Sequence, residues 1–332
     1  MSKNYDSEII EHSLSLHKTF PVIDLHADTF SVIESHREFL DGDLRRHLDL
    51  PRMEKSGIDA EIFSIFVYPN GEEPSRWLIR AREILSRITD AQEQSEGRFG
   101  IATSVGDISR NIVEGVISGV IEIEGLHPLG GNIGLLGEFY RCGVRVFTLT
   151  WNNSNAWAVS CMDDFSEIHG LTDEGFCAVS EINRLGGVID LSHSGVKTFW
   201  DVIDKSKTAP VCSHSCCKEI KDSSRNLDDD QVIAMIDRGG IIGVNFFPGF
   251  LSSKKYSKTT PADIVDHIEY IFDMGGEDNV GLGSDFDGVQ CLPGMRDCSD
   301  IYLVTCEMLK RGYSDYVIEK AVSYTHLTLP TN

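Results

Sequence analysis

Short apolar runs alternate along the chain with longer amphipathic stretches. The first run, Pro21-Val-Ile-Asp-Leu-His-Ala-Asp28, contains β-branched residues and predicts a buried strand. Similar runs lie at 57–67, 119–124, 143–150, 187–193, 209–214, 240–246 and 279–285. Apolar residues at helical spacing predict helices at about 6–18, 75–97, 172–185, 196–206, 228–238, 261–274 and 299–311. Strands that alternate with helices form parallel sheets, and eight of them in 332 residues predict a closed (β/α)8 barrel.

The predicted elements form one uninterrupted series. No linker or change of composition divides the chain, so we expect a single barrel domain over residues 1–321. Residues 322–332 do not continue the helical pattern of 314–321, and they resemble translated adaptor DNA at the end of a truncated reading frame. We therefore expect this tail to be foreign to the fold, and we assign no role to His326.

Polar side chains stand at the ends of five of the predicted strands. His26 and Asp28 are two residues apart, so they can point to one side of a strand and offer a nitrogen and an oxygen to one ion. The full set is His26, Asp28, Glu124, His193, His214 and Asp285. Because active sites form at the carboxyl ends of barrel strands, we expect these groups to converge. They suffice for two divalent ions that share a hydroxide, and nitrogen and oxygen donors favour zinc, with manganese or cobalt as alternatives.

Other residues are alternative candidates for the metal-binding and catalytic positions. Glu122 shares a strand face with Glu124, and Asp287 shares one with Asp285. Three residues are candidates for supporting positions behind a ligand: Asp24, His127 and Asp190. A second His-x-Asp, at His47–Asp49, follows no strand and predicts a loop. The remaining histidines are expected to face solvent: His12, His17, His36, His169 and His267.

The composition of the chain limits the kinds of partner and the cellular compartment that we expect. A formal net charge of −22 argues against nucleic acid or an anionic membrane surface. No apolar run is long enough to span a membrane, and the N-terminus lacks the apolar core of a signal peptide. Nine scattered cysteines, an odd number, favour reduced thiols in a cytoplasm. Cys212, Cys216 and Cys217 flank His214 without a Cys-x-x-Cys pair, so we expect them to be buried small hydrophobic residues.

Six motifs together resemble the membrane dipeptidase (renal dipeptidase) family of zinc peptidases, and in particular its soluble bacterial members. They are Ile23-Asp-Leu-His-Ala-Asp28, Glu124-Gly, Ile189-Asp-Leu-Ser-His193, Pro210-Val-Cys-Ser-His214-Ser, Ser224-Arg-Asn226 and Gly283-Ser-Asp-Phe-Asp-Gly288. The resemblance extends from about residue 20 to 320. It implies a dipeptidase that also accepts a D-residue at the C-terminal position, and it is compatible with a homodimer.

The resemblance also implies roles for single residues. His26 and Asp28 would hold one zinc, His193 and His214 the other, and Glu124 would bridge them together with a hydroxide that attacks the scissile carbonyl. Asp285 would take a proton from the attacking water and deliver it to the leaving amine. Arg225 would bind the terminal carboxylate of the substrate, for which a planar guanidinium is suited.

The chain departs from the family pattern in three places. After the fourth predicted strand, where the family commonly has a histidine, stand Trp151 and Asn152, whose indole N–H or amide could donate to an oxyanion. The C-terminal segment typical of the family is missing behind the tail. The lipid-anchor signal of animal members is absent, which favours a cytoplasmic enzyme.

The sequence therefore predicts a binuclear zinc dipeptidase, with two alternatives. The first is another metal-dependent hydrolase on the same barrel, acting on a cyclic amide, lactone or phosphotriester. Many of those use a carboxylated lysine between the metals, and no lysine ends a strand where Glu124 stands. The second is a non-catalytic barrel that only binds metal or a peptide, inactivated by truncation or by Trp151.

Overall fold

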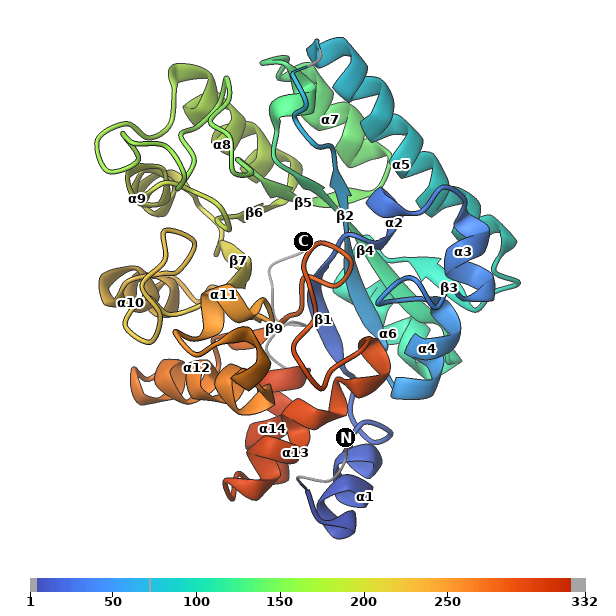
Figure 1. Ribbon diagram of the computed structural model, residues 1–332. Helices are drawn as coiled ribbons and strands as arrows, with labels where there is room; N and C mark the ends of the chain where they lie inside the picture. The colour runs from blue at the N-terminus through green and yellow to red at the C-terminus, as the bar shows by residue number, and fades with distance from the viewer. Residues whose placement is uncertain (1–4, 72, 324–332) are drawn as a thin grey trace.

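The computed structural model describes residues 5–71 and 73–323, and Figure 1 traces their course. The strands of this part are β1 (Ile23–Ala27), β2 (Ala60–Phe66), β3 (Phe99–Ile101), β4 (Ile117–Glu124), β5 (Val144–Thr148), β6 (Val188–Asp190), β7 (Val211–Ser215), β8 (Ile241–Asn245) and β9 (Val280–Gly283). All pair in parallel. Eight of them close a ring in the order β1-β2-β4-β5-β6-β7-β8-β9, with β9 beside β1. The predicted (β/α)8 barrel is confirmed.

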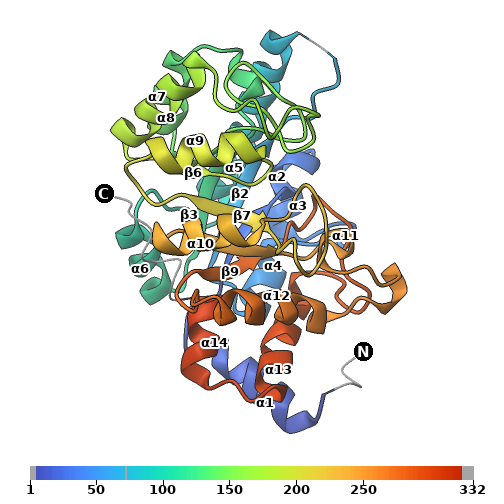
Figure 2. The same cartoon turned by 90° about the vertical axis from the view of Figure 1, so that its left-hand side faces the viewer.

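Helices surround this ring (Figures 1 and 2). They are α1 (Ser7–Leu16), α2 (Thr29–Val32), α3 (His36–Asp41), α4 (Leu50–Ser56), α5 (Pro74–Gln94), α6 (Val105–Glu114), α7 (Gly134–Arg141), α8 (Asp173–Leu185), α9 (Val196–Lys205), α10 (Asp229–Asp237), α11 (Pro248–Leu251), α12 (Pro261–Asp273), α13 (Tyr302–Lys310) and α14 (Asp315–Val322), with 3-10 turns at His127–Leu129, Tyr256–Lys258 and Cys298–Asp300. Several begin at a capping side chain: Ser104, Thr172 and Asp228 each accept a backbone N–H of the first turn.

Some elements were not predicted. β3 has three residues and pairs only with the start of β4, and α2, α3, α4 and α6 connect the first strands. The predicted loop at His47–Asp49 ends in the N-cap of α4, where Asp49 accepts the backbone N–H of Arg52. α14 includes Val322, the first residue of the expected tail, and buries it, and the foreign origin of the tail stays a prediction. Residues 324–332, with His326, lie outside the described part.

Two of the histidines expected at the surface are buried. The His17 side chain lies 2.8 Å from the hydroxyl of Thr305 on α13, which packs beside α1 (Figure 2). His267 on α12 accepts the backbone N–H of Cys217 and donates to the carbonyl of Leu251. Sequence periodicity missed both because a distant helix or loop covers each ring.

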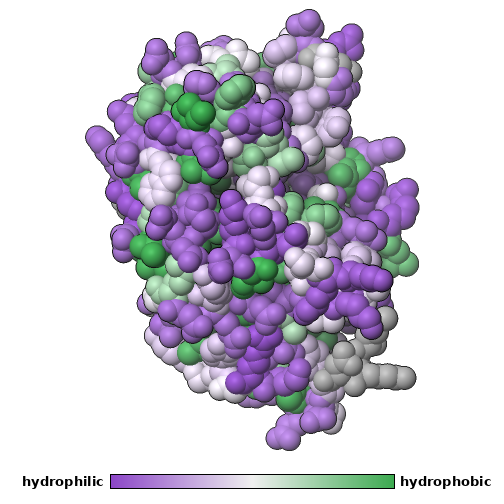
Figure 3. Space-filling view, turned by 60° about the vertical axis from the view of Figure 1, so that its left-hand side comes forward, coloured by the Kyte–Doolittle hydropathy of each residue, from purple (hydrophilic) through white to green (hydrophobic). Residues whose placement is uncertain are grey.

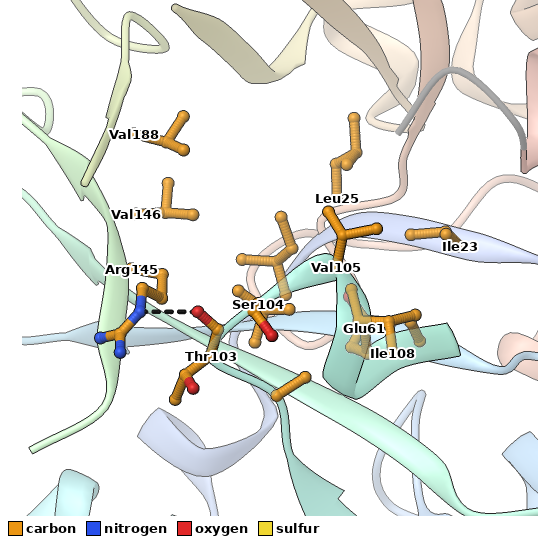
Figure 4. A pocket seen from close by; sticks show the side chains of 14 residues that line it. Ile23, Leu25, Glu61, Thr103, Ser104, Val105, Ile108, Arg145, Val146 and Val188 are labelled. Carbon is orange, nitrogen blue, oxygen red and sulfur yellow. Dashed lines mark hydrogen bonds between the residues drawn. The ribbon is translucent and has the colours of Figure 1, made fainter. Parts of the chain in front are cut away.

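The barrel interior at the N-terminal ends of the strands is aliphatic. Its cluster is Ile23, Leu25, Ala60, Ile62, Val146, Val188, Val211 and Ile241. Figure 4 shows Val146 and Val188 facing Ile23 and Leu25 across a small apolar hollow. Ile108 of α6 packs against this cluster, and Arg145 Nε donates to the carbonyl of Thr103 just before α6. The hydrophobic effect therefore holds this end of the barrel together.

The outer surface is mostly polar. The face in Figure 3 is largely hydrophilic, with hydrophobic residues in separate spots, as the net charge of −22 would suggest. Within the described residues, none of the helices combines the length and the apolar character of a membrane span. All nine cysteines are free, and Cys212, Cys216 and Cys217 are buried in the core as expected.

Candidate metal centre

An irregularity in β1 turns His26 toward the barrel axis. Asp24 pairs with Glu61 and Ala27 with Phe63, so Leu25 and His26 together stand opposite the single residue between them on β2. Such a bulge directs two consecutive side chains to the same face. Asp28 follows directly after the strand, at the N-cap of α2. His26 and Asp28 do come together, but a bulge and a strand end achieve this rather than the regular alternation that the sequence suggested.

Glu124 lies between the two halves of the site. Its Oε2 is 3.7 Å from His26 Nε2, while its Oε1 is 3.1 Å from His193 Nε2 and 3.7 Å from His214 Nε2. The ring nitrogens of His193 and His214 are 2.9 Å apart. One carboxylate oxygen therefore faces each side, which is the arrangement that a bridging ligand requires.

Each histidine is held by its other ring nitrogen. Nδ1 of His26 lies 2.7 Å from Glu122 Oε2, and Nδ1 of His193 lies 2.8 Å from Asn152 Oδ1. Nδ1 of His214 lies 2.7 Å from the hydroxyl of Ser213, which in turn donates to Asp190. Donation from Nδ1 fixes the tautomer and leaves each Nε2 lone pair directed into the site.

Below the ligands, a buried hydrogen-bond chain connects the two halves. The hydroxyl of Thr148 contacts Glu122, and it lies 2.8 Å from Asp190. A hydroxyl has one hydrogen, so it can donate to only one of these carboxylates. Burial raises the pKa of Glu122 to about 7 against the opposing effect of His26, and the charge of Asp190 adds to the rise. A proton on Glu122 would complete the chain from His26 through Glu122, Thr148, Asp190 and Ser213 to His214.

Two carboxylates approach each other on the β1 and β9 side. Asp285 accepts a hydrogen bond of 2.9 Å from Asn245 Nδ2, and burial, together with the charge of Asp28, raises its pKa to about 6. A Cβ on Gly288 would lie 2.2 Å from Asp28 Oδ2 and 2.3 Å from Asp285 Oδ1, so only glycine fits there. Both Asp285 and His193 adopt left-handed backbone angles, with φ of 62° and 65°. Such strain is frequent at functional sites.

The competing candidates take structural positions. Asp287 accepts hydrogen bonds from the hydroxyl of Thr29 and the backbone N–H of His47, so it joins two loops. Asp24 accepts the backbone N–H of Ser284, and Glu122 lies behind His26. His127 contacts the carbonyl of Val67, at 2.7 Å from its Nε2, rather than a predicted ligand.

Arg225 is buried beside His193, which follows β6, and His214 on β7. Its Nη2 donates to the carbonyl of His214 at 3.2 Å, its Nε has no hydrogen-bond partner, and it lines a hollow with His193. Among the described residues it forms no ion pair with a carboxylate. A desolvated guanidinium without an anion is costly, so its surroundings are suited to an anionic group of a ligand.

Trp151 and Asn152 lie at the rim on the β5 side. The indole is 6.2 Å from the ring of His193, measured between centroids. Asn152 is exposed, and its carbonyl oxygen faces His193 Nδ1. Nothing in the sequence indicated this contact between Asn152 and a histidine, and the expected contact of Asn152 with substrate stays a prediction.

The sequence analysis missed residues that support the site. They are Ser64, Thr148, Ser213, Asn245 and Gly288. Two of the five could have been found from the sequence, because Ser213 directly precedes His214 and Gly288 ends the last of the six motifs. The other three are polar residues on inward strand faces, with nothing in the sequence to distinguish them.

These residues fit a metal ion. Ligand atoms of His26, Glu124 and His214 lie within 4.8 Å of one another, and so do those of His26, Asp28 and Asp285. His26 Nε2 is buried and has no hydrogen-bond partner. Burial lowers the pKa of His193 and of His214, which favours the neutral imidazole that binds metal. Nitrogen and oxygen donors without thiolate suit zinc, manganese or cobalt.

A (β/α)8 barrel with histidines and carboxylates gathered at the carboxyl ends of its strands is typical of metal-dependent hydrolases. Comparison with known proteins makes the assignment specific: residues 10–327 match the family described as membrane dipeptidase, peptidase family M19. The chain therefore belongs to the membrane dipeptidase family and is a metallo-dipeptidase, as the sequence motifs predicted.

Similar proteins and similar solved structures support the same family assignment. The chain is 31% identical over 288 residues to dipeptidase verJ of Clonostachys rogersoniana, covering 83% of this chain and 73% of the relative. It is 32% identical over 311 residues to dipeptidase aclJ of Aspergillus oryzae, covering 89% and 74%. The structure is similar to a metallo peptidase from Rhodobacter sphaeroides liganded with a phosphinate mimic of L-Ala-D-Ala, with a TM-score of 0.87, 25% identity and coverage of 94% and 99%. It is also similar to dipeptidase AC, a metallo peptidase of family M19, with a TM-score of 0.88, 26% identity and the same coverage of 94% and 99%.

Proposed function

We propose that the chain is a zinc-dependent dipeptidase that hydrolyses dipeptides, including those with a C-terminal D-residue. The observation that carries this proposal is the position of Glu124, with one oxygen toward His26 and the other toward His193 and His214. In the proposed site His26 and Asp28 hold one zinc ion, His193 and His214 hold the second, and Glu124 bridges them. When bound, the ions would supply an activated water and polarise the scissile carbonyl.

Asp285 is the proposed general base and acid. It takes a proton from the attacking water and delivers it to the leaving amine. Burial and the nearby charge of Asp28 raise its pKa to about 6, which is close to the pH at which proton transfer in both directions is efficient. The hydrogen bond from Asn245 directs the carboxylate into the site.

Arg225 is the proposed site for the carboxylate at the C-terminus of the substrate. The buried guanidinium has an Nε without a hydrogen-bond partner and no carboxylate partner among the described residues. A substrate carboxylate would supply both the missing acceptor and the missing negative charge. Trp151 and Asn152 are proposed to face the substrate from the β5 side, and the amide N–H groups of Asn152 remain available because its carbonyl contacts His193. The mimic of L-Ala-D-Ala in the Rhodobacter sphaeroides neighbour supports acceptance of a D-residue. A homodimer and a cytoplasmic location stay predictions.

The test combines metal content with turnover. We expect about two zinc ions per chain and hydrolysis of Gly-D-Ala or Ala-D-Ala by the wild type. Asp285→Asn should keep the metal and lose activity by about 10²–10⁴-fold, as expected for a missing general acid and base. Asp287→Asn is the matched control, because Asp287 holds two loops rather than the site, and it should lose much less activity.

Two results would contradict the proposal. Metal-loaded protein that hydrolyses no dipeptide but opens a cyclic amide or lactone would favour the alternative hydrolase. Folded protein that binds no metal would refute the site itself.

A further inference from the structure

Three aromatic side chains, Phe66, Tyr68 and Trp151, form a cluster at the rim of the site. The ring of Trp151 is 4.9 Å from that of Phe66 and 5.6 Å from that of Tyr68, measured between centroids. Its distance to the ring of His193 is 6.2 Å. This aromatic cluster is therefore continuous with the proposed metal ligands.

The position of Phe66 follows from the register of β2. Ser64 contacts Asp28 and lies 3.3 Å from Glu124 Oε2. Phe66 is two residues further along the strand, so it points to the same side and stands one layer above, beside Glu124 on β4. Tyr68 follows just beyond the strand. The cluster thus rises from the ligands toward solvent.

The cluster exposes apolar surface where a substrate would enter. Tyr68 is 62% exposed, and Phe66 and Trp151 are partly exposed. Phe66 and Tyr68 also border a surface hollow that is lined by Val32 and Ile84 and by the charged residues Arg80, Glu83 and Arg87. Exposed aromatic groups beside a site are characteristic of ligand contact, because rings offer a large rigid surface at a small cost in entropy.

The β2 side of the cluster lies opposite Arg225. β2, which carries Phe66, and β7, which precedes Arg225, are separated by four places in the ring of eight strands, so they face each other across its axis, whereas β5, which precedes Trp151, is two places from β7. The two Cα atoms of a dipeptide are about 3.8 Å apart. A dipeptide with its carboxylate on Arg225 and its peptide bond over Glu124 would therefore extend its N-terminal residue toward Phe66 and Tyr68.

We propose that Phe66, Tyr68 and Trp151 bind the side chain of the N-terminal residue of the substrate and select an aromatic or large aliphatic one. This inference rests on the proposed dipeptidase function. The rings carry no charge and can stack on an aromatic side chain or pack on an aliphatic one. A glycine at the N-terminal position has no side chain to contact them.

The experiment compares kcat/KM for Phe-Ala with kcat/KM for Gly-Ala within each variant, using whichever enantiomer of alanine is turned over. A ratio within one enzyme cancels any general loss of activity or metal. The wild type should prefer Phe-Ala, and Tyr68→Ala should lower the ratio about three- to tenfold, the value of an aromatic contact. Tyr68→Phe should keep it. Because Tyr68 is exposed, its replacement is compatible with folding, and Phe66→Leu provides a second variant that should lower the ratio.

The matched control is Tyr316→Ala, since Tyr316 on α14 is also 62% exposed and should leave the ratio at the wild-type value. A wild type that prefers Gly-Ala, or a ratio that Tyr68→Ala and Phe66→Leu leave unchanged, would overturn the inference while the dipeptidase function stands. Absence of turnover on every dipeptide would instead refute the proposed function, and the inference with it.

Discussion

The two ends of the barrel interior use the same strands and opposite chemistry. At the N-terminal ends, Ile62 and Val146 belong to an aliphatic cluster that α6 closes. One layer further along, Ser64 on β2 and Thr148 on β5 belong to the polar network around Glu124. On β2 and β5, stability and chemistry are thus separated by only two residues along the strand. We therefore expect mutations at one end to leave the property of the other end largely intact.

The largest effect should come from the polar end, with Glu124→Gln. The amide has one carbonyl oxygen and no charge, so it cannot face both halves of the site as the carboxylate does. We expect metal affinity to fall by more than the roughly 10–100-fold that removal of a supporting residue costs, with loss of activity and little change in urea unfolding of the metal-free protein. Metal titration checks this, with the exposed Glu114→Gln as control. Unchanged binding of two ions would contradict the bridging role.

The next effect belongs to the apolar end, with Ile62→Ala. Ile62 is 5% exposed, and truncating a buried isoleucine should lower the free energy of unfolding by about 2–5 kcal/mol. Metal content per folded chain should stay the same. Urea unfolding measures the loss, and Ile79→Ala is the control because Ile79 is 55% exposed on α5. If Ile62→Ala also removed the metal, the two ends would not be separable.

A smaller effect should follow from Thr148→Val, which keeps the shape and removes the hydroxyl. Glu122 and Asp190 then lose the hydroxyl that contacts both of them. The hydrogen-bond chain behind His26 is therefore no longer connected to the chain behind His214. We expect zinc affinity to fall about 10–100-fold, measured by competition with a chelator, and Thr148→Ser to restore it. A purely structural role would instead lower stability and leave the affinity of the folded protein unchanged.

The smallest effect concerns pH and His17, which lies outside the barrel between α1 and α13. Burial lowers the pKa of His17 from 6.5 to about 4. The unfolded chain therefore binds a proton that the folded chain excludes, so this stability is present above about pH 6.5 and is lost as the pH falls toward 4. We expect a loss of roughly 1–2 kcal/mol between pH 7 and pH 5. His17→Gln should flatten that slope in urea unfolding, and an unchanged slope would contradict the buried neutral state of His17.

Part of this molecule was predictable from sequence. Apolar runs ending in His26, Glu124 and His214 determine both the barrel and its site, because strand ends in a parallel barrel meet at one face. Asp285 was also expected at a strand end, but its role in proton transfer depended on the family motifs, as did the role of Arg225, since a single acid or arginine does not reveal its function.

The rest depends on contacts between distant segments. The bulge that turns His26 inward appears only when β1 and β2 are paired. Thr148 differs from other threonines only through Glu122 and Asp190, which come from two other strands. His17 is buried because α13 lies beside α1. No local pattern of residues encodes these relations.

The most direct test of the central claim is the anomalous scattering of crystals of the zinc-loaded protein, measured above and below the zinc absorption edge. We expect two zinc peaks inside the carboxyl end of the barrel, one beside His26 and Asp28 and one beside His193 and His214, with Glu124 between them. A single peak, or peaks away from Glu124, would contradict the claim.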